Sequence, residues 1–202
     1  MSVEVEFHYD FGSPNSYFCH RVIPGIEERT GVKFKYVPIL LGGVFKATNN
    51  KSPMEQFAEV KNKKEYQSRE IERFIEKHRL DKYTRNPNFP VNTLHLMRGA
   101  CYALGKDWET DYIEAMYQCM WERGLAMGDP DVITDALMEY GLPAAEIVQS
   151  TQDPAVKQIL MNSTTASVEK GNFGSPTFFV RNEMFFGKDK LRDVEEEILA
   201  QQ

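Results

Sequence analysis

The stretch VEVEFHYDFGSPNSYF, from Val3 to Phe18, decides the fold of this chain. Residues 3–9 alternate apolar and polar side chains, which is the period of a β-strand. Ser13 and Pro14 follow a short break. Serine caps the free amides of a helix, and proline fits the first helical position. The pattern therefore predicts a strand, a tight turn and a helix that runs to about Thr30, with a kink or a restart at Pro24.

The remaining segments predict further strands at both ends of the chain and a long helical region between them. Residues 32–37 alternate again and predict a second strand, so that the N-terminal part forms a βαβ unit. Residues 40–52 are rich in Gly and Asn and are expected to form a loop, whereas residues 53–171 show helical spacing throughout. The C-terminal part returns to two short strands within residues 177–186, predicted as a hairpin, and a last helix over residues 190–200.

The order βαβ, helices, ββα predicts an α/β fold: a thioredoxin-like sheet with an all-helical insertion. We expect residues 1–44 and 172–202 to form the thioredoxin-like domain, and residues 45–171 to form the helical insertion domain.

Composition restricts the class of protein. The chain has 202 residues, with 24 Lys and Arg against 30 Asp and Glu, which gives a formal charge of −6. This acidic balance argues against nucleic acid or an anionic membrane as partner, since both select for excess positive charge. Three cysteines make a disulfide framework unexpected and favour a reducing compartment. Without a signal peptide or an apolar run of roughly 18 residues, the protein is expected to be soluble and cytoplasmic.

In a thioredoxin-like fold, the reactive group lies at the turn between the first strand and the helix that follows it. A Cys-x-x-Cys pair there has its thiolate stabilised by the helix N-terminus. This chain has Ser13 and Ser16 at those two positions, so the redox pair is absent. Ser13 is either a hydrogen-bond donor to a bound anion or simply a helix cap. Pro176, just before the third strand, occupies the place of the cis-proline of such folds.

Four short motifs, in this order, resemble the 2-hydroxychromene-2-carboxylate isomerases, which group with kappa-class glutathione transferases in the DsbA-like branch of the thioredoxin fold. The resemblance covers essentially the whole chain. The motifs are DFGSP at 10–14, VFKA at 44–47 with Asn49 and Asn50 after it, FGSPTF at 173–178 and FGKDKL at 186–191.

The resemblance implies glutathione as cofactor and an unsaturated aromatic carboxylate as substrate. Ser13 would hydrogen-bond the glutathione thiolate as the catalytic residue, and the thiolate would add reversibly to the substrate. It also implies a homodimer. The other residues implied for glutathione are Asn50 (with Asn49 as an equal choice of register), Ser175, Pro176, Lys188 and Asp189, and those implied for the substrate are Lys46, Asn86 and Phe89.

Two alternatives share this frame. One is a kappa-class-like glutathione transferase or peroxidase that uses the same Ser13 site. The other is a non-catalytic DsbA-like protein that binds thiols or peptides. The histidines show no spacing typical of metal ligands, so no metal is expected.

Overall fold

The computed structural model describes residues 3–202 and confirms the predicted βαβ beginning. Strand β1 is Val5–Tyr9, helix α1 is Pro14–Thr30 and strand β2 is Phe34–Pro38. The helix is continuous across Pro24, so the predicted restart is wrong. Gly31 ends the helix with φ of 70°, a left-handed conformation that glycine adopts without a steric cost.

Within the described residues, four strands form one sheet in the order β2-β1-β3-β4. Strand β3 is Thr177–Val180 and strand β4 is Glu183–Phe186. The β1–β2 pair is parallel, and the β1–β3 and β3–β4 pairs are antiparallel. Val180 lies opposite Glu183, which leaves a two-residue turn and confirms the predicted hairpin. A 3₁₀ turn, Lys188–Lys190, and helix α10, Leu191–Ala200, complete the chain.

Helix α2, Leu41–Thr48, lies where the sequence predicted a loop. Gly42 and Gly43 lower intrinsic helix propensity, and tertiary packing overrides that preference here. A Cβ atom on Gly43 would lie 3.2 Å from the Thr164 side chain, so the glycine allows α2 to approach α9 closely. The Thr164 hydroxyl also accepts a hydrogen bond from the amide of Leu40, the residue just before α2.

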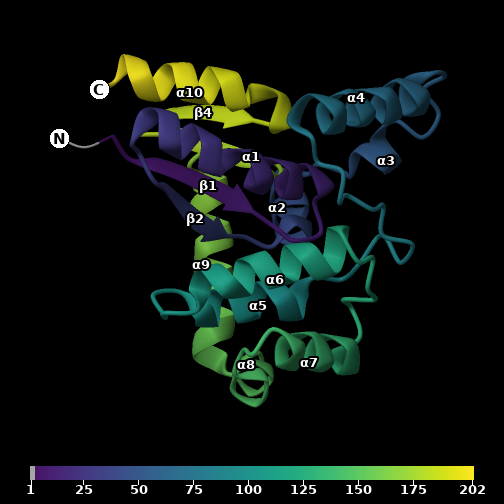
Figure 1. The fold of residues 1–202 in the computed structure, drawn as a ribbon, viewed down its shortest axis with the longest axis vertical. Coiled ribbons are helices and arrows are strands. Elements are labelled where there is room, and N and C mark those ends of the chain that lie inside the picture. The colour runs from purple at the N-terminus through teal and green to yellow at the C-terminus, as the bar shows by residue number, and fades with distance from the viewer. Residues whose placement is uncertain (1–2) are drawn as a thin grey trace.

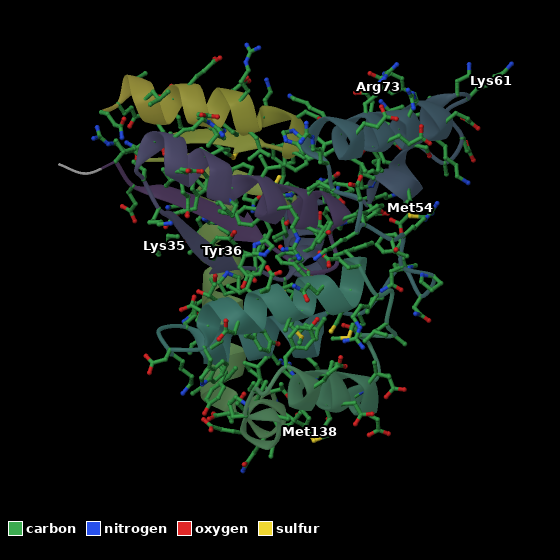
Figure 2. All side chains as sticks on the ribbon, viewed as in Figure 1. Lys35, Tyr36, Met54, Lys61, Arg73 and Met138 are labelled. Atoms are coloured by element: carbon green, nitrogen blue, oxygen red, sulfur yellow. The ribbon has the colours of Figure 1, made fainter. Side chains whose placement is uncertain are left out.

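The rest of the insertion is helical, as predicted. In Figure 1, α7 and α8 lie farthest from the sheet, α9 runs back from them to the sheet, and α3 and α4 project to one side. Figure 2 shows Lys61 and Arg73 pointing outward from that projection. None of the helices within residues 3–202 is long and apolar enough to traverse a bilayer. The elements are α3 Pro53–Gln56, α4 Lys63–His78, α5 Leu94–Ala103, α6 Glu109–Trp121, α7 Pro130–Glu139, α8 Ala144–Ser150 and α9 Pro154–Glu169.

The two faces of the sheet are covered by different helices. Phe7 contacts Tyr36 edge to face, and the Tyr36 hydroxyl lies 2.9 Å from His20 Nδ1 on α1. The opposite face carries His8, whose Nδ1 lies 2.7 Å from the Ser167 hydroxyl on α9. Helix α10 packs beside α1 and against β3. The sheet is therefore a layer between α1 with α10 and α9.

Charged side chains join α1 to α6 of the insertion. Arg21 donates to Glu114 at 2.7 Å and to Glu122 at 2.6 Å, and His20 Nε2 lies 2.9 Å from Glu114. Burial lowers the pKa of His20, whereas hydrogen bonds from His20 and Arg21 lower the pKa of Glu114 to about 2. Glu114 is therefore ionised at neutral pH and accepts from both neighbours.

Asp10 joins three segments at the carboxyl end of β1. Its buried carboxylate accepts from the Gly12 amide at 2.8 Å, the Leu41 amide at 2.8 Å and the Thr93 hydroxyl at 2.7 Å. These donors lie in the turn before α1, at the start of α2 and at the start of α5. Burial raises the pKa of Asp10, and the three hydrogen bonds oppose that shift. The carboxylate thus fixes the Ser13 turn against the insertion.

We predict that Asp10→Asn destabilises the fold by about 1–3 kcal/mol, because an amide NH₂ would face a backbone N–H and leave buried donors unpaired. Asp129→Asn is the matched control. Asp129 caps α7 from an exposed position, and asparagine caps a helix about as well as aspartate. Chemical denaturation measures both. Equal stability of the two variants would show that Asp10 does not have this role.

Candidate functional site

Ser13 occupies the N-cap of α1, as the sequence predicted. Its backbone is extended, with φ of −94° and ψ of 114°, and its side chain accepts from the Ser16 amide at 3.2 Å. Pro14 is the first helical residue. The Ser13 hydroxyl therefore lies at the positive end of α1, where an anion is stabilised by the free amides and the helix dipole.

The loop before β3 faces this helix end. The Ser175–Pro176 peptide bond is cis, which confirms the sequence prediction. Ser13 donates its hydroxyl to the Ser175 carbonyl at 3.1 Å, and the Ser16 and Ser175 hydroxyls lie 2.8 Å apart. Within residues 3–202 the backbone N–H of Ser175 donates to no other group of the chain. Three serine hydroxyls and one free amide thus meet at the junction.

The register of β3 and β4 places Lys188 and Asp189 beside the same loop. Thr177 lies opposite Phe186, and the Gly187 amide donates to the Pro176 carbonyl at 2.9 Å. The Lys188 ammonium is buried, pairs with Asp189 and lies 4.8 Å from the Phe74 ring centroid. The Asp189 side chain is 73% exposed. The arrangement holds a carboxylate at the surface while its partner lysine is packed inside.

Of the two asparagines left open by the sequence, Asn50 contacts the loop. Its side chain donates to the Phe173 carbonyl at 2.8 Å. Asn49 ends α2 in a left-handed conformation with φ of 54° and is exposed. Lys46 is exposed on α2, one helical turn before Asn50. The structure thus brings Asn50 to the segment that precedes Ser175.

Asn86 and Phe89 lie in the segment between α4 and α5. The Asn86 amide nitrogen donates to the carbonyls of Met120 and Leu125, both at 2.9 Å, and its oxygen accepts from the Asn88 amide. The Asn86 side chain therefore has its hydrogen bonds within the protein. A direct substrate contact by Asn86 stays a prediction that this geometry does not favour.

Phe89 is linked to the Ser13 turn through Trp121. The Phe89 ring centroid lies 5.8 Å from that of Trp121, and the indole N–H donates to the Phe11 carbonyl at 2.8 Å. The Phe89–Pro90 bond is also cis, which the sequence did not predict. Phe89 is half-buried.

The thiols of the chain take no part in this site. Cys19, Cys101 and Cys119 are buried, and none forms a disulfide. Burial raises the pKa of each thiol, that of Cys101 to about 12. In the part of the chain that the structure describes, no group of three His, Cys, Asp or Glu residues is arranged to hold a metal ion.

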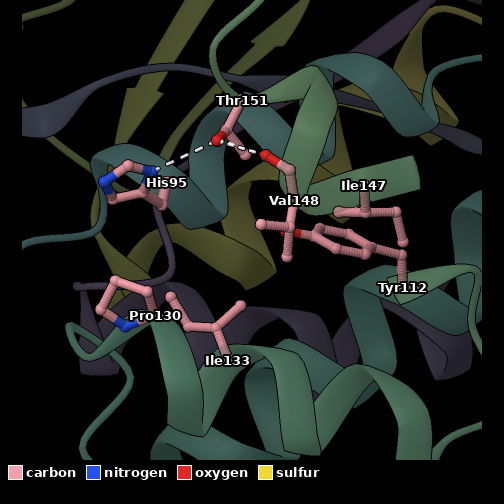
Figure 3. A pocket seen from close by; sticks show the side chains of 7 residues that line it. All are labelled: His95, Tyr112, Pro130, Ile133, Ile147, Val148 and Thr151. Atoms are coloured by element: carbon pink, nitrogen blue, oxygen red, sulfur yellow. Dashed lines mark hydrogen bonds between the residues drawn. The ribbon is translucent and has the colours of Figure 1, made fainter. Parts of the chain in front are cut away.

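Two hollows lie in the insertion, away from Ser13. One, shown in Figure 3, has a volume of about 20 Å³ between His95, Tyr112 and Ile133, which is room for about one water. The other is an open surface hollow of about 450 Å³ whose lining includes Glu146 and Asp153. The first hollow is too small for an aromatic substrate, and the carboxylates of the second repel an anionic ligand.

Comparisons with known proteins agree with this geometry. A sequence model of the DSBA-like thioredoxin domain matches residues 4–199. A 2-hydroxychromene-2-carboxylate isomerase of Sphingobium xenophagum is 27% identical over 98% of this chain and 100% of its own length. A protein named glutathione S-transferase kappa 1 of Caenorhabditis elegans is 25% identical over 93% of this chain and 87% of its own.

A solved structure of a 2-hydroxychromene-2-carboxylate isomerase superimposes with a TM-score of 0.82. It is 23% identical, and the match covers 98% of this chain and 95% of the other. At that identity the superposition establishes the fold. The predicted α/β architecture with a helical insertion is therefore confirmed.

The helix end should acidify a thiol placed at Ser13. We predict that the thiol of Ser13→Cys has a pKa below about 8.5, the value of a free cysteine. Ser68→Cys is the control, because Ser68 is exposed in the middle of α4. The thiolate absorbance of each variant, titrated against pH, measures the pKa, and the three buried thiols stay protonated in that range. Equal values for both variants would contradict the anion site.

Proposed function

Because the chain belongs to the DSBA-like thioredoxin family, we propose that it is a glutathione-dependent isomerase of an unsaturated aromatic carboxylate, such as 2-hydroxychromene-2-carboxylate. The observation that carries this proposal is Ser13, whose hydroxyl stands at the helix N-cap opposite a cis-proline loop. A donor there suits a thiolate brought by a cofactor. The names of the similar proteins, isomerases and a kappa glutathione transferase, support the same reading.

The residues at this end of the sheet fit glutathione. The free N–H of Ser175, next to Pro176, can pair with the peptide backbone of the cysteinyl part. The exposed Asp189 carboxylate suits the γ-glutamyl ammonium group, and Lys188 holds that carboxylate in place. Asn50 supports the loop from the side of α2.

When bound, glutathione supplies a thiolate that adds reversibly to the conjugated system of the substrate and is released unchanged after the double bond has isomerised. A free thiol with a pKa of about 8.5 is only a few per cent ionised at neutral pH. Ser13 has one hydroxyl proton, which it donates to the Ser175 carbonyl in the structure. We propose that Ser13 redirects this proton to the sulfur, because a hydrogen bond to an anion is stronger than one to a neutral carbonyl.

The substrate side of the proposal rests on Lys46 and Phe89. Lys46 is exposed and positively charged on α2, so it can attract the substrate carboxylate. Phe89 offers an aromatic surface next to Trp121. We propose a cytoplasmic protein, since reduced glutathione is plentiful in a reducing compartment, and a homodimer.

A kappa-class-like transferase is the second candidate, favoured by the similarity to glutathione S-transferase kappa 1. It would use the same Ser13 and the same glutathione contacts but would release a stable conjugate. An assay of product identity separates the two reactions. An isomerase regenerates free glutathione, whereas a transferase consumes it. A non-catalytic thiol-binding protein would do neither.

We predict that isomerisation of 2-hydroxychromene-2-carboxylate requires added glutathione and falls by about 10²-fold in Ser13→Ala, the usual cost of losing one donor to a reacting anion. The pKa of bound glutathione, read from thiolate absorbance, should rise in this variant. Ser68→Ala on the exposed face of α4 is the control. Activity of thiol-free protein would eliminate the mechanism.

We predict that Asp189→Asn weakens glutathione binding by roughly tenfold or more, because it removes a charge-assisted contact to the ammonium group. Glu183→Gln changes an exposed carboxylate on the preceding strand β4, and this variant should bind glutathione as the unchanged protein does. Calorimetric titration of both variants with glutathione measures the effect. An unaltered affinity in Asp189→Asn would refute the assignment.

A further inference from the structure

A chain of buried polar side chains lies on the α9 face of the sheet, outside the site around Ser13. His8 Nε2 lies 3.1 Å from the Glu6 carboxylate, and His8 Nδ1 lies 2.7 Å from the Ser167 hydroxyl. The Asn172 amide nitrogen donates to the same hydroxyl at 2.7 Å. All four side chains are buried. The chain connects β1, α9 and the segment that leads to the cis-proline loop.

For the His8 tautomer that carries its proton on Nε2, each hydrogen bond of the chain has a defined direction. The Asn172 NH₂ can only donate, so the Ser167 oxygen accepts from it and the Ser167 proton is available to His8 Nδ1. His8 then donates from Nε2 to Glu6. Hydrogen bonds from His8 and Lys170 hold the pKa of Glu6 well below its usual range, so the last acceptor is a carboxylate.

This Ser-His-Glu sequence of contacts resembles a nucleophilic relay, but access excludes that role. The Ser167 side chain is on the inner side of α9 and the residue is 1% exposed. Ser167 lines neither of the two hollows in the insertion described above. A nucleophile must reach its substrate, so the chain has another use.

The Asn172 side chain also fixes the loop that faces Ser13. Its side-chain oxygen accepts from the Gly174 amide and from the Thr177 hydroxyl, both at 2.8 Å. These two donors bracket Ser175 and Pro176. A Cβ atom on Gly174 would lie 2.6 Å from the Phe186 ring, so the loop is also confined from the side of β4. Asn172 therefore controls where the Ser175 backbone lies.

We propose that Asn172, oriented by Ser167 and His8, is the positioning residue that holds the Ser175 backbone ready for the thiol cofactor. This inference rests on the proposed function, since it concerns the same glutathione contact. Asn172 touches neither cofactor nor substrate. It acts through Gly174 and Thr177, and its orientation is set by the amide–hydroxyl–imidazole chain that ends at Glu6.

The test compares Asn172→Ala, Asn172→Asp and Ser163→Ala. Alanine removes the acceptor of both loop donors, whereas aspartate keeps an oxygen for them and should restore much of the function. Ser163 is the control, because its hydroxyl joins α9 to the Pro38 carbonyl at 2.6 Å without touching the loop. Its loss should lower stability without changing glutathione affinity.

The positioning role is tested by two measurements: amide exchange in the ligand-free and glutathione-bound protein, and the affinity for glutathione. In Asn172→Ala we expect amide exchange at Gly174 to become at least about tenfold faster, and glutathione to bind roughly tenfold more weakly. Ser167→Ala should show a smaller change in the same direction, and it carries the test if Asn172→Ala does not fold. Folded variants with unchanged exchange and unchanged affinity would overturn the proposal.

The two proposals fail differently. If the unchanged protein does not bind glutathione, the proposed function is wrong, while amide exchange in the ligand-free variants still reports whether Asn172 fixes the loop. If the unchanged protein binds glutathione and Asn172→Ala binds it equally well, only the positioning role is wrong. If glutathione binds weakly to Asn172→Ala and more tightly again to Asn172→Asp, the result supports both the proposed function and the positioning role.

Discussion

The Asp10 carboxylate accepts three hydrogen bonds from segments 2, 31 and 83 residues away in the chain. Burial of a carboxylate is costly unless its oxygens are paired, so the turn before α1, the start of α2 and the start of α5 must lie where they do. Ser13 follows this turn directly, and its own amide donates to the Asp10 carbonyl. The position of the serine therefore depends on the contact between sheet and insertion.

The opposite half of the site is fixed by separate means. The antiparallel register of β1, β3 and β4 brings Thr177 and Phe186 to the end of the sheet where Ser13 lies. Asn172 then sets the loop before β3 from the side of α9. Ser13 and Ser175 therefore meet because two separate sets of hydrogen bonds hold them. Asp10 fixes the turn that carries Ser13, and Asn172 fixes the loop that carries Ser175. A hydroxyl and a backbone amide held in this way lose little freedom when a ligand binds.

Local signals in the sequence predicted the elements whose causes are local. The alternation in β1, the Ser13–Pro14 helix start and the turn between β3 and β4 all depend on neighbouring residues, and the structure confirms them. Helix α2 was missed because its stability comes from Thr164 and Asp10 and not from its own glycine-rich sequence. Asp10 and Asn172 were also missed as organising residues, since their partners are identified only by the fold.

All three cysteine thiols of the chain are buried and lie away from the end of α1 where Ser13 stands. Each cysteine is buried, and burial disfavours the thiolate, which is the reactive form. Cys19 lies on α1, the same helix whose N-terminus would stabilise a thiolate, but it is turned into the core. Helix end, hydroxyl and open amide are thus assembled around a position where this chain supplies no sulfur. Such a helix end suits an anion, and under the proposed function that anion is the glutathione thiolate, with which the buried cysteines would not compete.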